Sequence, residues 1–166
     1  MHRSHSILPL LHQAFLSNGK KLAVAESCTG GLLSEKLTQH PGASKYFIVG
    51  LVTYSNISKR DFLKVSPETI RKFGAVSQEV VIEMIHGLFS LTEADIALSV
   101  SGVLGPEKDA SSAKPLGTVW MAISHRTTLS NPHTQLVPLQ KPRSRIFNRN
   151  FVVRYLLQTL YDYQQT

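Results

Sequence analysis

The sequence predicts a single α/β domain, built as a three-layer α/β/α sandwich around a mixed sheet. Helical patterns stand at both ends of the chain, and short apolar runs of strand length alternate with helical patterns between them. Two late strands are expected to join as a hairpin through Ser130-Asn131-Pro132, which adds antiparallel pairing to the sheet. A length of 166 residues fits one domain.

The first half of the chain contains two helical patterns and two strands. Apolar residues repeat at helical spacing from Ile7 until Asn18-Gly19, where glycine suits a helix C-terminus. A short strand follows over Lys21–Ala25. The second helix is expected over Gly30–Gln39, with a proline–glycine pair directly after it. The almost wholly apolar run Tyr46–Tyr54 predicts a buried strand.

Capping residues mark the helices of the middle region. Ser66-Pro67-Glu68 reads as a cap, a proline at the first helical position and an acid, and Gly74 ends this short helix. Ser77 is expected to cap a longer helix with an apolar stripe on one face. The run Asp95–Val100 predicts another buried strand.

The last third begins with a long polar loop over Gly102–Pro115. This loop exceeds the usual length of about 4–6 residues, and long loops are often functional. Two strands are expected over Thr118–Ser124 and Thr134–Leu139, joined as the hairpin. A closing helix is expected over Arg143–Asp162, where apolar residues again recur.

Charge is unevenly distributed along the chain, which carries a formal net charge of +7. No acidic residue lies between Asp109 and Asp162. A local positive field attracts anions such as a phosphate-bearing small molecule, nucleic acid or anionic lipid, although a solvated basic face explains most of these residues. The basic residues of this stretch are Lys114, Arg126, Lys141, Arg143, Arg145, Arg149 and Arg154.

Composition excludes several classes of protein. The single cysteine, Cys28, excludes an internal disulfide and multi-cysteine metal sites. No run approaches the ~20 apolar residues that span a membrane. We therefore expect a cytoplasmic protein with no membrane partner. The seven histidines stand in no motif, and we interpret them as surface or helix residues.

The run Ala25-Glu26-Ser27-Cys28-Thr29-Gly30-Gly31 lies between a predicted strand and a predicted helix. It offers three adjacent candidate nucleophiles at a helix N-terminus, where backbone N–H groups favour developing negative charge. Its two glycines would allow a ligand to approach the backbone closely. The alternative is plain helix capping by Ser27 or Thr29.

A second motif supplies a candidate base. Ser27, Tyr54 and Ser101 each stand at the end of a predicted strand, and ligand sites of such sheets lie beyond these ends. Lys59 follows Tyr54 by five residues. A lysine acts as a base only when burial or nearby positive charge keeps it partly neutral. In a Ser-Lys pair, the Lys59 amine would lie within hydrogen-bond reach of the Ser27 hydroxyl.

Five short motifs, in this order, resemble the C-terminal domain of the bacterial CinA (competence/damage-inducible) family. The resemblance covers about Leu11 to Leu160, and the family includes stand-alone nicotinamide-nucleotide amidases. The motifs are Ala25–Gly31, Tyr54–Lys59, Gly74–Ser77, Val100–Pro106 and Lys114–Val119.

The resemblance implies roles for individual residues. Ser27 matches the nucleophile, Lys59 its base, and Tyr54 a further residue of the catalytic site. Arg145 matches an arginine that would bind the substrate phosphate, and an arginine at a helix N-terminus opposes the helix dipole unless a ligand explains it. The residues expected to contact the substrate are Thr29, Gly30, Gly31, Ser101, Gly102, Arg145 and Arg149, with backbone donors near Gly30 and Gly102 expected to hold the oxyanion.

The implied activity is deamidation of nicotinamide mononucleotide to nicotinic acid mononucleotide and ammonia, by a Ser-Lys mechanism without metal or cofactor, in a homodimer. The segment 107–113 lacks the glycine pair that the family carries there, so a catalytically silent nucleotide-binding member remains an alternative. A nucleic-acid-associated basic protein is another alternative, although no standard nucleic-acid motif is present. Cys28 is the second candidate nucleophile, because a helix N-terminus can lower a thiol pKa.

Overall fold

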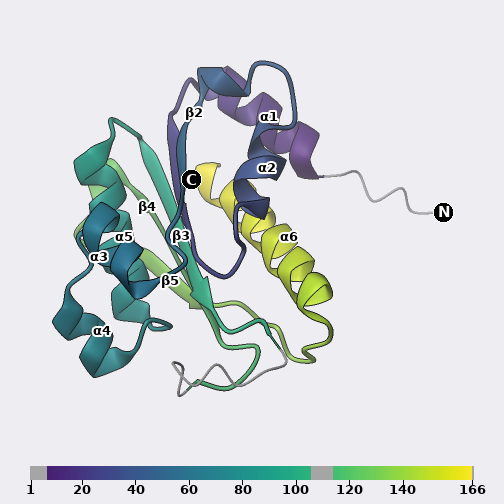
Figure 1. Ribbon diagram of the computed structural model, residues 1–166. Coiled ribbons are helices and arrows are strands. Elements are labelled where there is room, and N and C mark those ends of the chain that lie inside the picture. The colour runs from purple at the N-terminus through teal and green to yellow at the C-terminus, as the bar shows by residue number, and fades with distance from the viewer. Residues whose placement is uncertain (1–6, 106–113, 166) are drawn as a thin grey trace.

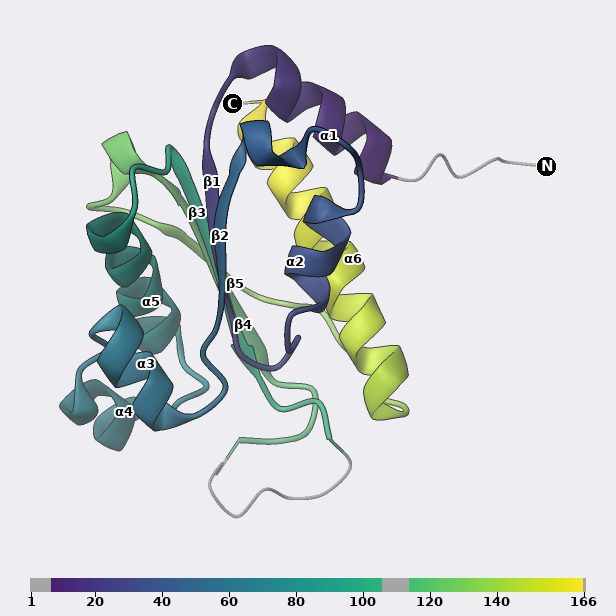
Figure 2. The same ribbon diagram turned by 45° about the horizontal axis from the view of Figure 1, so that its top comes forward.

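A computed structural model describes residues 7–105 and 114–165. Its sheet consists of β1 (Leu22–Glu26), β2 (Phe47–Val52), β3 (Ile96–Gly102), β4 (Val119–His125) and β5 (His133–Leu136). Its α-helices are α1 (Ile7–Asn18), α2 (Leu32–Thr38), α3 (Asn56–Leu63), α4 (Pro67–Phe73), α5 (Gln78–Leu91) and α6 (Arg145–Gln164). Helices α1, α2 and α6 cover one face of the sheet, and α3, α4 and α5 cover the other (Figures 1 and 2). The predicted three-layer α/β/α sandwich is confirmed.

The sheet is mixed, as predicted. Its strand order is β2-β1-β3-β4-β5, with β1 parallel to both neighbours and β4 antiparallel to β3 and β5. Glu26 at the end of β1 is in register with Val52 on β2 and Val100 on β3. Because the three strands are parallel, the residues that follow them, Ser27 and Thr53 among them, meet at one edge of the sheet.

Two hydrophobic clusters flank the sheet, and β1 contributes alternate residues to each. Leu22 and Val24 pack toward α1, α2 and α6, whereas Ala23 and Ala25 pack toward α5. The sheet residues on the α5 side include several alanines, which allow this helix to lie close to the strands. The large residues of that cluster come mainly from α5 itself: Val80, Val81, Met84, Ile85 and Leu88.

The serine caps are confirmed. Ser66 and Ser77 accept hydrogen bonds from the backbone N–H groups of Glu68 and Val80 and so begin α4 and α5. Short 3-10 turns at Ala43–Lys45 and Arg126–Thr128 were not expected from the sequence. The segment 107–113 lies outside the described residues.

Several element boundaries differ from the sequence-based expectation, and three of these differences have a local structural reason. Helix α2 begins two residues late, because Gly30 and Gly31 have φ angles of 57° and 91° in the left-handed region. Strand β5 ends before Pro138, which has no N–H for a sheet ladder. The closing helix begins at Arg145, where Ser144 accepts a hydrogen bond from the Phe147 N–H.

Gly87 lets α5 approach the end of α3. A Cβ atom placed on Gly87 would lie 2.2 Å from the carbonyl oxygen of Leu63, the last residue of α3. Backbone atoms cannot move aside as a flexible side chain can. The position of α3, which carries Lys59, therefore depends on the absence of a side chain at this point of α5.

Gly87→Ala is expected to lower the free energy of unfolding by about 1–3 kcal/mol, because the added methyl group overpacks the α3–α5 contact. Helix propensity alone predicts the opposite sign, a gain of up to about 1 kcal/mol. Urea denaturation measures the change. Ser90→Ala on the exposed end of the same helix is the control, expected to stay within about 0.5 kcal/mol of wild type. A more stable Gly87→Ala protein would contradict the packing argument.

Candidate active site

Ser27 lies in the tight turn between β1 and α2. Its backbone N–H donates to the carbonyl of Val100 on β3 at 3.0 Å, and its own carbonyl accepts from the Gly30 N–H at 3.1 Å. Only 7% of the residue is exposed. The Gly30 N–H is thus occupied within the turn. The backbone donors expected near Gly30 therefore do not include the N–H of Gly30 itself.

The carboxylate of Glu26 occupies the N-terminus of α2. One oxygen accepts from the N–H groups of Gly31 and Leu33, both at 3.1 Å. The other accepts from the Ser34 N–H at 2.8 Å and its hydroxyl at 2.6 Å. Glu26 is fully buried, and the positive end of the helix compensates its charge. The sequence suggests free N–H groups at this helix N-terminus for a developing anion. Those of Gly31, Leu33 and Ser34 instead already donate to Glu26.

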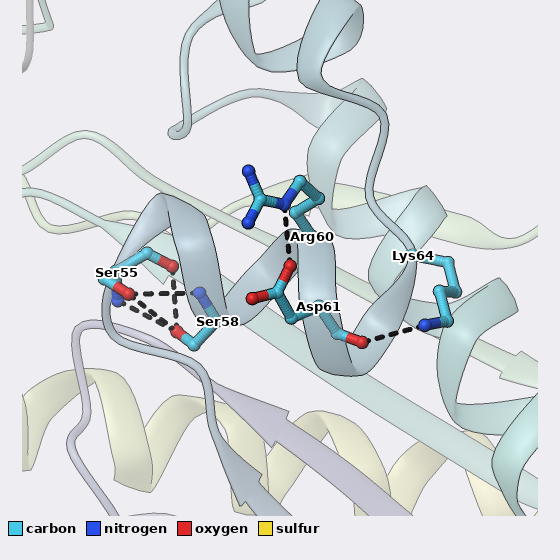
Figure 3. Close-up of polar contacts among 5 residues, drawn as sticks. All are labelled: Ser55, Ser58, Arg60, Asp61 and Lys64. Carbon is cyan, nitrogen blue, oxygen red and sulfur yellow. Dashed lines mark hydrogen bonds and ion pairs between the residues drawn. The ribbon is translucent and has the colours of Figure 1, made fainter.

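A capping box begins α3 and so orients Lys59. The Ser55 hydroxyl accepts from the Ser58 N–H, and the Ser58 hydroxyl accepts from the Ser55 N–H, both at 3.1 Å (Figure 3). Arg60 and Asp61 pair with each other on the exposed side of the helix (Figure 3). Lys59 lies on the inward side and is only 1% exposed. The sequence had placed it on the turn or the first helical turn after the second strand.

The Lys59 amine bridges the ends of β1 and β2. Nζ donates to Oγ of Ser27 and to the carbonyl oxygen of Thr53, each at 2.9 Å. The amine is therefore within hydrogen-bond reach of Ser27, as the sequence predicts. No carboxylate of the described residues forms an ion pair with this amine. Burial lowers the pKa of Lys59 to about 8, so a large share of the amine is neutral near that pH.

Cys28 does not have the character of a thiolate. It is 4% exposed, and burial raises the pKa of its thiol to about 12. Its own backbone N–H and the charges of Lys59 and Arg145 lower this pKa only in part. The expectation that the helix N-terminus activates Cys28 is therefore wrong, because desolvation outweighs the nearby positive groups.

Tyr54 and Arg145 meet although 91 residues separate them. Arg145, the first residue of α6, donates from Nη2 to the Tyr54 hydroxyl at 2.5 Å. A Cβ on Gly105 would lie 3.3 Å from Nη1, so the guanidinium also passes close to the segment after β3. Tyr54 is 59% exposed, and this pair lies at the open side of the site. Arg149 lies one turn further along α6 and is half-buried.

The other predicted contact residues are held within the fold. The Ser101 hydroxyl, 1% exposed, donates to the Ala75 carbonyl at 2.8 Å. A Cβ on Gly102 would lie 2.6 Å from Cγ2 of Val119, so close packing against β4 explains this glycine. The Thr29 hydroxyl is buried and has no hydrogen-bond partner among the described residues. Contact of these residues with a substrate stays a prediction.

Sequence reasoning missed three residues on which the site depends. The carboxylate of Glu26 caps α2, the carbonyl of Thr53 holds Lys59, and Gly87 admits α3. Only Gly87 had a usable signal, since an isolated glycine in a helical pattern often marks close packing. Among the histidines, His12 lies in α1 but not on the surface. His12 is 8% exposed, and its Nδ1 lies 3.2 Å from the Tyr46 hydroxyl.

A family model described as the CinA C-terminal domain matches residues 5–163. The chain belongs to this family. A CinA-like protein of Petrotoga mobilis is 54% identical over 66% of the chain, and one of Leptospira biflexa is 38% identical over 95%. The aligned parts are 27% and 37% of those proteins, so the chain spans about a third of the length of these relatives.

Solved structures of CinA proteins superpose over nearly the whole chain. The crystal structure of a CinA superfamily protein from Klebsiella pneumoniae matches with a TM-score of 0.88 and 32% identity, covering 99% of each chain. A competence/damage-inducible protein from Agrobacterium tumefaciens matches with a TM-score of 0.85 and 32% identity, covering 100% of each. This chain therefore has the fold of the CinA family.

The described residues contain neither a metal-binding cluster nor a membrane-spanning helix. Within residues 7–105 and 114–165, no three His, Cys, Asp or Glu side chains gather closely enough to bind a metal ion. No helix of these residues has the length and apolar character needed to cross a membrane.

Glu26→Gln is expected to lower the free energy of unfolding by about 1–3 kcal/mol, because a neutral amide replaces one acceptor oxygen with a donor that faces backbone N–H groups. Chemical denaturation measures the loss. Glu35→Gln is the control on the same helix. Its side chain is exposed and pairs with Lys36, so a change of at most about 1 kcal/mol is expected. Equal effects of the two substitutions would show that the cap contributes little.

Proposed function

We propose that this chain is an amidohydrolase that deamidates nicotinamide mononucleotide to nicotinic acid mononucleotide and ammonia. The observation that carries the proposal is the buried Ser27–Lys59 pair, with Nζ 2.9 Å from Oγ and a lysine pKa lowered to about 8. A nucleophile beside a partly neutral base is the arrangement that acyl transfer requires. The choice of substrate rests on the resemblance to the amidases of the CinA family.

In the first half of the reaction, neutral Lys59 accepts the hydroxyl proton of Ser27 while Oγ attacks the carboxamide carbon. A tetrahedral intermediate forms with negative charge on the former carbonyl oxygen. Lys59 then gives its proton to the amide nitrogen, the C–N bond breaks, and ammonia leaves. The product of this half is an ester between Ser27 Oγ and the pyridine carbonyl.

In the second half, water attacks the ester carbonyl and Lys59 takes a proton from the water. The C–O bond to Ser27 breaks, and Lys59 returns the proton to Oγ. Nicotinic acid mononucleotide is released and the enzyme regains its starting state. Throughout, the Thr53 carbonyl accepts a second hydrogen bond from Nζ, which keeps the amine directed at Ser27.

Backbone N–H groups directly after the nucleophile are the proposed oxyanion donors. The N–H groups of Gly30, Gly31 and Leu33 already donate to Ser27 and Glu26. Those of Cys28 and Thr29 donate to no other residue in the described part of the chain. The donor that follows a nucleophile commonly serves this purpose in acyl transfer.

The phosphate of the substrate would bind at the beginning of α6. Arg145 lies there with its guanidinium against Tyr54, and Arg149 follows four residues later on the same side of the helix. The first turn of α6 contains no acidic residue. A guanidinium can hold a phosphate through two parallel hydrogen bonds.

We also infer a homodimer in the bacterial cytoplasm. Several large apolar side chains are exposed along and beside β2, one of the two edge strands of the sheet, and an apolar edge favours association with another chain. These residues are Ile48, Val52, Ile57 and Phe62.

Ser27→Ala is expected to reduce ammonia release from nicotinamide mononucleotide by at least about 10³-fold, because the proposed covalent intermediate forms on Oγ of Ser27. Circular dichroism and the melting temperature should stay close to wild type. Cys28→Ala is the matched control next in the chain, expected to retain turnover. Loss of activity in Cys28→Ala together with retention in Ser27→Ala would reverse the assignment.

The pH dependence follows from the lowered pKa of Lys59. The protonated amine cannot accept the Ser27 proton, so kcat/KM is expected to rise about tenfold per pH unit below pH 8 and to level off above it. Initial rates between pH 6 and 10 give the profile. A rate that stays flat from pH 6 to 8 would exclude Lys59 as the base.

A further inference from the structure

Asn148 is a fully buried amide in the first turns of α6 whose hydrogen-bonding groups are all used. Its Oδ1 accepts from the Arg143 N–H at 2.7 Å. Its Nδ2 donates to the carbonyl of Arg143 at 3.1 Å and to that of Leu104 at 3.2 Å. The side chain is 0% exposed. Asn148 therefore ties together α6, the loop that precedes α6, and the segment that follows β3.

These tied segments surround Arg145. Arg145 lies three residues before Asn148, so the two share a side of the helix. The Arg145 guanidinium passes Gly105, the neighbour of Leu104, on its way to the Tyr54 hydroxyl. The amide thus fixes both the backbone from which Arg145 extends and the segment beside its guanidinium.

We propose that Asn148 is a positioning residue that orients Arg145 toward the substrate phosphate, an inference that rests on the proposed function. A bidentate contact with phosphate requires a fixed orientation of the guanidinium plane. If the start of α6 were loose, the Arg145 side chain would have to become ordered at each binding event, which costs binding free energy. A buried Asn148 amide without hydrogen-bond partners would also lower the stability of the fold. Replacing Asn148 is therefore expected to weaken phosphate recognition without removing a catalytic group.

If Asn148 had only a structural role, replacing it would lower the stability of the protein and leave phosphate recognition unchanged. The deciding quantity is the phosphate preference, defined as kcat/KM for nicotinamide mononucleotide divided by kcat/KM for nicotinamide riboside. The preference is measured in the wild type, Asn148→Ala, Arg145→Ala and the double variant. Gln164→Ala is the matched control, since Gln164 is a buried amide at the far end of the same helix.

Arg145→Ala is expected to lower the preference by roughly 10- to 100-fold through KM for the phosphorylated substrate. Asn148→Ala should lower it by about 5- to 10-fold with little change in kcat. The double variant should match Arg145→Ala, because a residue that acts only through Arg145 adds nothing once Arg145 is gone. An unchanged preference in Asn148→Ala, or a further loss in the double variant, would overturn the proposal.

Crystal structures of the variants supply a readout that does not depend on activity. The contact between Arg145 Nη2 and the Tyr54 hydroxyl should be lost in Asn148→Ala and kept in Gln164→Ala. If the wild type does not deamidate the nucleotide, the proposed function fails, and these structures alone decide the positioning role. Should Asn148→Ala fail to fold, Asn148→Leu preserves the side-chain volume and undergoes the same measurements. Retention of the contact in the folded Asn148 variant would refute the inference.

Discussion

Burial of the Lys59 amine, which has no carboxylate partner in the described part of the chain, is the constraint on which the site depends. An ammonium group is costly to remove from water, and the amine is left with one hydroxyl and one carbonyl as acceptors. Both acceptors follow strands whose ends lie side by side in the sheet, and the amine reaches them from α3. Gly87 lets α3 lie close to α5, and the position of α3 determines where the Lys59 amine lies. The packing at Gly87 therefore affects the contact between Lys59 and Ser27.

The buried acid and the buried lysine of the site are kept apart. Glu26 precedes Ser27 directly, yet its carboxylate faces the N-terminus of α2 and forms no ion pair with Lys59. A carboxylate bonded to the amine would favour the ammonium form and raise its pKa. The helix N-terminus satisfies the anion in place of the lysine. This separation allows one short motif to contain a buried acid while the neighbouring lysine stays partly neutral.

The basic residues of the last third serve different purposes that their charge alone does not reveal. Arg126 donates to the backbone carbonyls of Phe89, Thr92 and Ala94, so it joins the end of α5 to the start of β3. Arg143 stacks on the ring of Phe147, with its guanidinium carbon 4.6 Å from the ring centre. Arg145 instead reaches across to Tyr54. The positive charge of this third of the chain therefore comes in part from arginines, Arg126 and Arg143, that have structural contacts of their own.

Local patterns in the sequence determined the order and type of the elements, the serine caps and the strand ends that carry Ser27 and Tyr54, because periodicity and capping are properties of neighbouring residues. The pairing of Ser27 with Lys59 was also within reach, since parallel strands end at one edge. Only the tertiary structure decided that Glu26 caps α2, that burial disables Cys28 as a thiolate, and that Asn148 clasps the start of α6. Each of these features depends on desolvation or on contacts between distant segments, so the pattern of neighbouring residues in the sequence does not predict it.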